Sequence, residues 1–430
     1  MGCHVQAFSR NQWQESAIVS CNDISQGGVR ARSTFEYDLD YAFLLDSQPV
    51  SLGFPIDAEH HSLTQWPAFL YDLIPQGAGR KYLLGQLDLA DGPGADFALI
   101  CAGAFNPIGS IRVKEAVDFY QHHISLHDPA QFIGGLSLKQ IIERDDAFAE
   151  RMLVHGMLAA GTTGVQGAAP KYLLTCDHEN RWHADGALDD THAASHYIVK
   201  LPRGKTAADK KVLRNEAAYM RVAQVMGLDT HAQLELRNDM LFIPRFDRAA
   251  LKGKVQRYSQ ESAASIAGVV GFDARPTQYD LLRGLRRVLT DKEKGTVEFL
   301  LRDVLNLAMR NTDNHARNTA VQKIGNEVKL TPLYDFAPMY LDPETIARAA
   351  RWYHPTTKTE LKNWHDVIAA LDIPEAEKSI IRMQMASFGK KIETLADCMH
   401  ECGVDNDIIS HLGNGIDEQI LQLRELAMQR

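Results

Sequence analysis

The stretch RNTDNHARNTAV, residues 310–321, decides the fold that we expect for this chain. Before it, apolar residues recur at helical spacing from Val297 to Ala308, so we expect a helix that ends at about Arg310. The motif itself is polar and contains an aspartate, a histidine and an asparagine. The predicted helix therefore delivers these side chains into the loop beyond its end.

The spacing of the polar residues is typical of phosphoryl transfer. Asp313 and Asn318 are five residues apart, His315 lies between them, and Asp335 follows an alternating strand-like stretch, 328–334. Protein kinases use an aspartate to orient the attacking hydroxyl, an asparagine five residues on, and an Asp-Phe pair on the next hairpin to hold magnesium. Each residue alone is equally consistent with a turn cap. Their joint spacing predicts Asp313 as catalytic base and Asn318 and Asp335 as magnesium ligands.

Phosphates also need a cation and a flexible backbone nearby. The segment GTTGVQG, residues 161–167, supplies a glycine-rich stretch, and Lys200 lies inside the apolar run HYIVKLP, where an unpaired ammonium is costly to bury. We expect Glu216, near the start of a helix from Asn215 to Met226, to pair with Lys200. The alternatives are a lysine that snorkels from an edge strand and an exposed glutamate in a first helical turn.

Composition gives weaker limits. The chain has 430 residues, a net charge of -9 and six scattered cysteines, which favours a globular protein with reduced thiols and no global attraction to nucleic acid. The first residues lack the apolar core of a signal peptide, and no stretch reaches the roughly 18 apolar residues of a membrane span. We therefore expect a cytoplasmic protein without a membrane partner.

The order of these features along the chain predicts an α+β, two-lobed protein-kinase-like fold. We expect an N-terminal α+β module over residues 1–145, a nucleotide-binding region with glycine loop, strand lysine and hinge over 146–250, and a mainly helical lobe with the catalytic loop over 251–430. The expected strands are Tyr41–Leu45, Phe97–Cys101, Pro170–Thr175, Tyr197–Leu201 and Met240–Pro244, and the helix that begins with Asn215 as N-cap is expected to stop at Gly227.

A family resemblance covers nearly the whole chain. The segments that carry it are GVQGAAPKYLL, HYIVKLP, NEAAYMRVAQVMGL, FIPRFDR, NTDNHARN and LTPLYDF, with FEYDLDYAFLL and FLYDLIPQG toward the N-terminus. On these segments the chain resembles the HipA family of serine/threonine kinases, which are toxins of bacterial toxin-antitoxin pairs, and its YjjJ-like branch. The resemblance implies ATP and Mg²⁺, a protein substrate such as an aminoacyl-tRNA synthetase, a helix-turn-helix antitoxin, and contact with DNA only through that partner.

The same resemblance implies a fuller set of nucleotide-binding residues. It assigns a phosphate loop, a phosphate-contacting lysine, an adenine hinge and a group around the catalytic loop. These residues are, in that order, Thr163, Gly164, Val165, Gln166 and Lys171; Lys200; Pro244, Arg245 and Phe246; and His315, Ala316, Arg317, Asn318, Tyr334 and Asp335.

Two departures from the family pattern affect these expectations. The family usually has a glutamate where this chain has Pro244, which has no backbone N–H to donate. It also commonly has a serine, open to autophosphorylation, where this chain has Gly161, so Thr162 and Thr163 become the candidates for that modification. Two other functions stay open: a small-molecule phosphotransferase of the aminoglycoside or choline kinase type, and an inactive kinase-like binding module that acts with an antitoxin.

Overall fold

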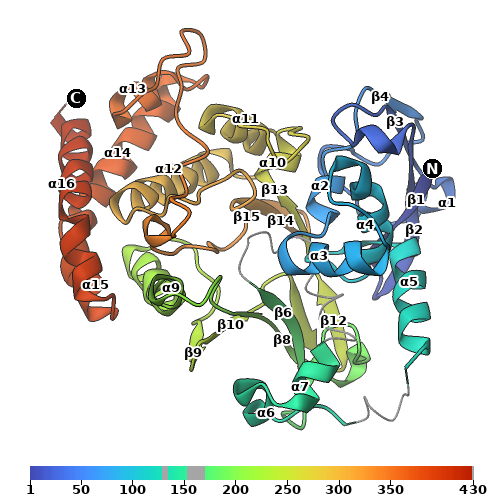
Figure 1. Cartoon of the computed structure of the whole chain (residues 1–430). Helices are drawn as coiled ribbons and strands as arrows, with labels where there is room; N and C mark the ends of the chain where they lie inside the picture. Colours follow the sequence, from blue (N-terminus) through green and yellow to red (C-terminus); the bar gives the residue numbers. More distant parts are fainter. Residues whose placement is uncertain (128–133, 153–169, 429–430) are drawn as a thin grey trace. The chain divides into compact units, whose positions relative to one another are not determined.

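The computed structural model describes residues 1–127, 134–152 and 170–428, drawn in colour in Figure 1. The chain forms two compact units. The first comprises Met1–Arg203, Phe242–Ala274 and Gln322–Ile324, and the second comprises Gly204–Leu241, Arg275–Val321 and Gly325–Arg430.

The first unit begins with an antiparallel sheet in the order β4-β3-β2-β1-β5. In β1, alternate residues are buried, as expected for a strand with one face on the core. Helices cover that core, whose largest buried side chains include Trp66 and Phe69. The strands are β1 (Gly2–Ser9), β2 (Gln12–Cys21), β3 (Ser33–Tyr37), β4 (His61–Leu63) and β5 (Ile111–Val113); the helices are α1 (Leu39–Ala42), α2 (Leu70–Leu73), α3 (Gly77–Gln86), α4 (Asp96–Gly103), α5 (Lys114–Ser125), α6 (Leu138–Glu143) and α7 (Asp146–Arg151).

A second sheet in the first unit contains the neighbours β7-β6-β8-β10. Strands β6 and β8 are antiparallel, and they and β10 agree with three of the five strands expected from the sequence. The bounds are β6 (Lys171–Asp177), β7 (Trp182–Ala184), β8 (Ala193–Lys200) and β10 (Met240–Pro244), followed by the hairpin β11 (Arg248–Leu251) and β12 (Lys254–Arg257), then β13 (Ser259–Ser262) and α10 (Ala263–Ile266).

A buried carboxylate, Glu261, connects β13 to the N-terminal part of the first unit. It accepts hydrogen bonds from Ser51 Oγ at 2.7 Å, the Leu52 backbone N–H at 2.7 Å and Ser265 Oγ at 2.6 Å. Burial raises the pKa of Glu261 to about 7, although the three hydrogen bonds act in the opposite direction. This carboxyl group therefore titrates near neutral pH.

The second unit is mainly helical. Helix α14 packs against α12 and α16, and the three lie side by side in Figure 1. Among the described residues, none of the helices combines the length and apolar character needed to cross a membrane. The elements are α9 (Ala207–Met226), β9 (Glu235–Arg237), α11 (Gln278–Val288), α12 (Lys292–Ala308), β14 (Ala320–Ile324), β15 (Glu327–Leu330), α13 (Trp364–Ala369), α14 (Glu375–Ile392), α15 (Leu395–Glu401) and α16 (Asn406–Met428).

Three local predictions were wrong. Neither expected run is a strand: Phe97–Cys101 lies within α4, and Tyr41–Leu45 consists of the last two residues of α1 followed by a turn. A short apolar run is compatible with both a helix and a strand. At α1 a local cap favours the helix, because the Asp38 side chain accepts a hydrogen bond from the Tyr41 N–H. Asn215 is no N-cap. It is buried inside α9, which Thr206 caps, although the helix does stop at Gly227 with a φ of 95°.

Candidate functional site

The polar motif begins where α12 ends. The helix terminates at Ala308, and Arg310 adopts a positive φ of 49°, which turns the chain out of the helix. The Asn311 side chain then donates hydrogen bonds to Asn306 Oδ1 at 3.0 Å and to the carbonyl of Asp335 at 3.4 Å. One asparagine therefore ties the start of the loop to the second acidic residue of the motif.

Asp313 and Asn318 are joined within the loop. The side-chain nitrogen of Asn318 donates to the backbone carbonyl of Asp313 over 2.5 Å, and its backbone N–H donates to the carbonyl of His315 over 2.9 Å. The amide oxygen of Asn318 is thereby turned away from this bond. The Asp313 carboxylate stays 27% exposed, with its oxygen 3.8 Å from His315 Nε2, so it is accessible to a ligand.

Asp335 is brought to the same place by two hydrogen bonds. The neighbouring Tyr334 donates its hydroxyl to the carbonyl of Arg317 over 2.8 Å, and Asn311 holds the carbonyl of Asp335 itself. The backbone of Asp335 has a φ of 52°, in the left-handed region that L residues other than asparagine and aspartate rarely adopt. These bonds attach the Asp335 segment to the loop that carries Asp313 and Asn318.

These three residues fit a magnesium ion chemically. Two carboxylates and an amide oxygen are hard oxygen donors, which Mg²⁺ prefers to nitrogen or sulfur. In addition, the side-chain oxygens of Asn311, Thr312 and Asn314 are buried without a hydrogen-bond partner among the described residues. Unsatisfied buried oxygens beside such a donor set indicate a place where polar ligands or water complete the bonding.

A buried aspartate that our sequence interpretation missed supports the loop. Asp303 of α12 is 2% exposed and accepts from Asn314 Nδ2 at 3.3 Å, Trp352 Nε1 at 2.7 Å and Arg348 Nη2 at 2.5 Å. The residue next to Asp313 is thereby attached to the helix before it. The sequence does carry a sign of this role, because Asp303 occupies a core position in an otherwise apolar helical pattern.

The first unit gathers the two predicted phosphate-contacting lysines. Lys171 and Lys200 are directly opposite each other on β6 and β8, and both are buried. Residues paired in this way point to the same face of a sheet, and like charges placed there destabilise it. This pairing places the two predicted lysines next to each other on the sheet.

The side chain of the predicted hinge residue Arg245 is buried in the first unit. Its side chain is 0% exposed and forms ion pairs with Asp185 at 2.5 Å and Asp247 at 2.6 Å, and its backbone N–H donates to the carbonyl of His196. Arg248 joins the same cluster through Asp185 at 3.1 Å. Any contact from Arg245 to a base would therefore come from its carbonyl group.

The opposite charges of this cluster keep one another ionised. Burial alone would raise the pKa of Asp185, but Arg248 and Arg245 overcome burial and hold it well below its usual value. Burial, with the Arg245 charge, lowers the pKa of Arg248 to about 10. All three side chains are ionised near neutral pH, so the cluster is a fixed ionic core that includes Arg245, the residue directly after β10.

The remaining predicted residues are distributed over both units. Pro244 and Phe246 are half-buried in the first unit, and the Phe246 carbonyl accepts from Gln322 Nε2 at 3.0 Å. Glu216 is buried in α9 of the second unit, and Ala316 is buried in the loop there. Thr162, Thr163, Gly164, Val165 and Gln166 lie outside the described residues.

Comparison with solved structures supports the fold. The chain is similar to one in the complex of the Shewanella oneidensis MR-1 toxin-antitoxin system HipA, HipB and its operator DNA, with a TM-score of 0.63 and 17% identity over 98% of this chain and 97% of that one. A Helicobacter pylori proinflammatory kinase, CtkA, matches 55% of this chain and 89% of its own with a TM-score of 0.38 and 12% identity. The expected α+β, two-lobed, HipA-like fold is thereby confirmed.

Comparison with protein families supports the lineage. No curated protein matches the sequence. The model of the HipA N-terminal domain matches residues 19–114, and that of the HipA-like C-terminal domain matches residues 163–401. Since the second match alone spans more than half of the 430 residues, the chain belongs to the HipA family.

Proposed function

We propose that this chain is an ATP- and Mg²⁺-dependent kinase of HipA type that phosphorylates serine or threonine on another protein, and that it acts as the toxin of a toxin-antitoxin pair. The observation that carries the proposal is a set of three hydrogen bonds in the second unit: Asn318 bonds to Asp313, and bonds through Asn311 and through Tyr334 to Arg317 attach the Asp335 segment to the same loop. This is the set of donors that phosphoryl transfer requires.

Each residue has a definite role in this proposal. Asp313 accepts a hydrogen bond from the substrate hydroxyl, orients it for in-line attack and takes its proton. Asn318 and Asp335 hold Mg²⁺ through their oxygens, and the bound ion neutralises charge on the phosphates. Lys171 and Lys200 of the first unit bind phosphate in this proposal.

The sharpest test removes the proposed base. Asp313→Ala should lower transfer of labelled phosphate from ATP to proteins of a cell lysate by about a hundredfold or more, the usual contribution of a positioned acid-base group. Asp397→Ala is the matched control, because Asp397 is an exposed aspartate of α15 in the same unit. Undiminished transfer in Asp313→Ala would remove Asp313 from the proposed role.

The two other functions give different outcomes in the same system. Labelling of aminoglycosides or choline but of no lysate protein would favour the small-molecule phosphotransferase. Absence of any heat of binding for ATP with Mg²⁺ in calorimetry would favour the inactive module, to which Pro244 at the hinge lends some support. Mass spectrometry after incubation with ATP tests Thr162 and Thr163 as modification sites.

The partner follows from the same family. In the Shewanella structure, HipA is in a complex with HipB and operator DNA. We extend this to the present chain as a helix-turn-helix antitoxin that mediates all contact with DNA. A mobility-shift experiment should retard operator DNA with the antitoxin or the pair and not with this chain alone. Retardation by the chain alone would contradict the indirect contact.

A further inference from the structure

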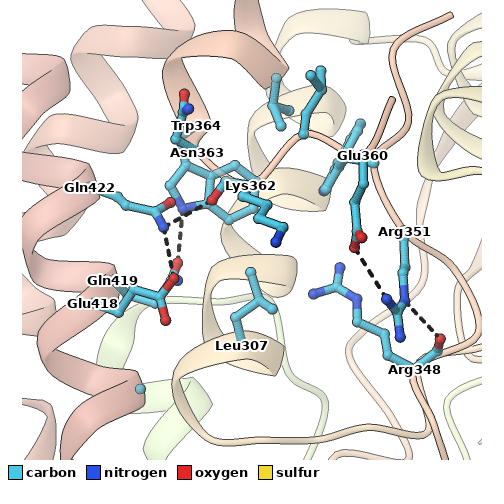
Figure 2. A pocket seen from close by; sticks show the side chains of 14 residues that line it. Leu307, Arg348, Arg351, Glu360, Lys362, Asn363, Trp364, Glu418, Gln419 and Gln422 are labelled. Carbon is cyan, nitrogen blue, oxygen red and sulfur yellow. Dashed lines mark hydrogen bonds and ion pairs between the residues drawn. The ribbon is translucent and has the colours of Figure 1, made fainter. Parts of the chain in front are cut away.

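The second unit contains a pocket that the proposed reaction does not use. Its volume is about 310 Å³, and it is bounded by the end of α12, the segment from 348 to 364, α13 and α16 (Figure 2). A cavity of this size holds a small organic molecule. Asp313, Asn318 and Asp335 do not line it.

The walls of the pocket are fixed by internal hydrogen bonds. Trp364 Nε1 donates to Gln419 Oε1 over 2.8 Å, and Gln422 Nε2 donates to the Lys362 carbonyl over 3.0 Å. These bonds, drawn in Figure 2, connect α13 and the preceding segment to α16. Because both tryptophans of the lining, Trp352 and Trp364, are otherwise buried, the pocket presents preformed apolar and amide surface.

Three cationic side chains line the pocket, and acidic partners neutralise two of them, Arg348 and Arg351. Arg351 is neutralised by Glu360 at 3.3 Å. Arg348 gives Nη2 to Asp303 and Nε to the Ala350 carbonyl, and its Nη1 donates to no residue in the described ranges. Figure 2 shows this guanidinium and the side chain of Lys362 directed into the pocket.

The ammonium of Lys362 has no ion-pair partner within the described part of the chain, and Glu418 lies on the other side of the pocket (Figure 2). One unneutralised ammonium and one spare guanidinium N–H therefore remain for a ligand at this side. Charge-assisted hydrogen bonds to a carboxylate or phosphate are roughly twice as strong as neutral ones, so an anion is the favoured occupant.

We propose that this pocket binds a small molecule with a phosphate or carboxylate group attached to a planar ring, and that its occupancy is transmitted to the catalytic loop. The anionic group sits between Arg348 and Lys362, and the ring packs against the indoles and Leu307. A guanidinium and an ammonium group can bind either a phosphate or a carboxylate, and the test compares the two.

The path of transmission is a chain of hydrogen bonds within the second unit. Arg348 bonds to Asp303, and Asp303 accepts from Asn314, the residue after Asp313. An anion that binds Arg348 competes with Asp303 for its guanidinium and so weakens the ion pair between the two. The Asp303 carboxylate also accepts the hydrogen bond from Asn314 in the loop, so a change at Arg348 reaches the loop. The transmission part of the proposal rests on the proposed function only for its effect on the rate of phosphate transfer.

Binding is measured on the full-length protein by tryptophan fluorescence, because two of its five tryptophans line the pocket. Phenyl phosphate and benzoate are the anionic probes and benzylamine is the cationic control with the same ring. We expect a saturable change with one or both anions and none with benzylamine, and the stronger of the two identifies the preferred anion. An equal response to benzylamine, or no saturable change with either anion, overturns the proposal.

Matched variants assign the response to the pocket. Lys362→Gln should weaken binding of the anionic probe about fivefold, the loss of one exposed charge-assisted contact. Lys390→Gln removes the same charge from an exposed position of α14 outside the pocket and should leave binding unchanged. Equal affinity in the wild type and Lys362→Gln overturns the assignment.

Transmission has a readout that does not need activity. Hydrogen exchange in peptides that cover residues 310–318 should slow when the probe binds to the wild type, and this change should shrink in Lys362→Gln. Protection confined to residues 348–364 and α16 overturns the coupling. If the exchange changes but the chain transfers no phosphate from ATP, the proposed function fails while the pocket stands.

Discussion

Replacing Asp303 by asparagine gives the clearest test of how the loop is held. The variant keeps the shape of the side chain and removes its charge. In the wild type, Asp303 accepts two short contacts from Arg348, at 2.5 and 2.6 Å, and one from Trp352 at 2.7 Å. Asparagine has one acceptor oxygen, and its NH₂ group would face an N–H donor on the other side.

The expected cost follows from these contacts. Hydrogen bonds to a charged group contribute about 1.5–3 kcal/mol each, and breaking a fully buried ion pair by removing one partner costs about 3–5 kcal/mol. Arg348 keeps 15% of its side chain in solvent, so part of its charge is rehydrated in the variant. The retained acceptor offsets part of the rest. We expect a loss of about 2–3 kcal/mol in the free energy of unfolding of the second unit.

The assay must separate the two units, because a chain of this size does not unfold in one step. Hydrogen exchange in peptides from α12 and residues 310–318 reports local stability directly. Asp397→Asn, at an exposed position of α15, should change exchange by less than about 0.5 kcal/mol. An Asp303→Asn variant that matches this control would refute the view that the carboxylate holds the loop.

A double-mutant cycle identifies the main partner. Arg348→Gln should also destabilise the unit, and the double variant should be less damaged than the sum of the two, with a coupling energy of about 1–3 kcal/mol. If the two effects simply add, the ion pair is not the main stabilising contact of Asp303, and the bonds from Trp352 and Asn314 take that place.

Three further predictions concern other parts of the fold. Glu261 keeps its proton in the folded protein up to a pKa of about 7 and loses it near 4.5 when unfolded, so the urea midpoint of the wild type should fall as pH rises from 5 to 7, whereas Glu261→Gln should show no such fall. Thr206→Ala removes the cap of α9 and should cost about 1 kcal/mol in urea unfolding, with Thr206→Ser close to the wild type. Asp185→Asn leaves Arg245 and Arg248 under-compensated in the interior and should destabilise the first unit by about 3 kcal/mol, seen as faster hydrogen exchange in β6 and β10.

Local sequence patterns predicted the parts of the fold in which one local preference dominates. Helix α12 repeats apolar residues over several turns and ends close to the expected position, and β10 matches its expected bounds. The secondary structure of the N-terminal part was harder to predict. Runs such as Phe97–Cys101 are apolar without a period, and a helix and a strand bury such a run equally well. The start of α9 was missed for another reason: Thr206, which caps the helix reciprocally with Asp209, lies nine residues before Asn215, the expected start.

The candidate site divides in the same way. Asp313, Asn318 and Asp335 could be found because their separation along the chain is itself a requirement of the chemistry. Asp303, Arg348 and Trp352 could not, because their roles depend on contacts between segments about 45 residues apart that no periodicity records. A buried carboxylate in an apolar helix indicates that a partner exists, and only the tertiary structure says which one.

Local irregularities around the loop support a functional origin only when they occur together. A positive φ alone says little, since aspartates such as Asp23 and Asp46 also adopt one in this chain. Asp335 differs because its positive φ coincides with a hydrogen bond from Asn311, whose own side-chain oxygen is buried without a partner among the residues that the structure describes. Folding stability alone favours neither a positive φ at an aspartate nor buried oxygens that find no hydrogen-bond partner in the described part of the chain. Under the proposed function, a bound Mg²⁺ with its water ligands would offset both costs, because it favours carboxylate and amide oxygens and its waters can bond to buried polar groups.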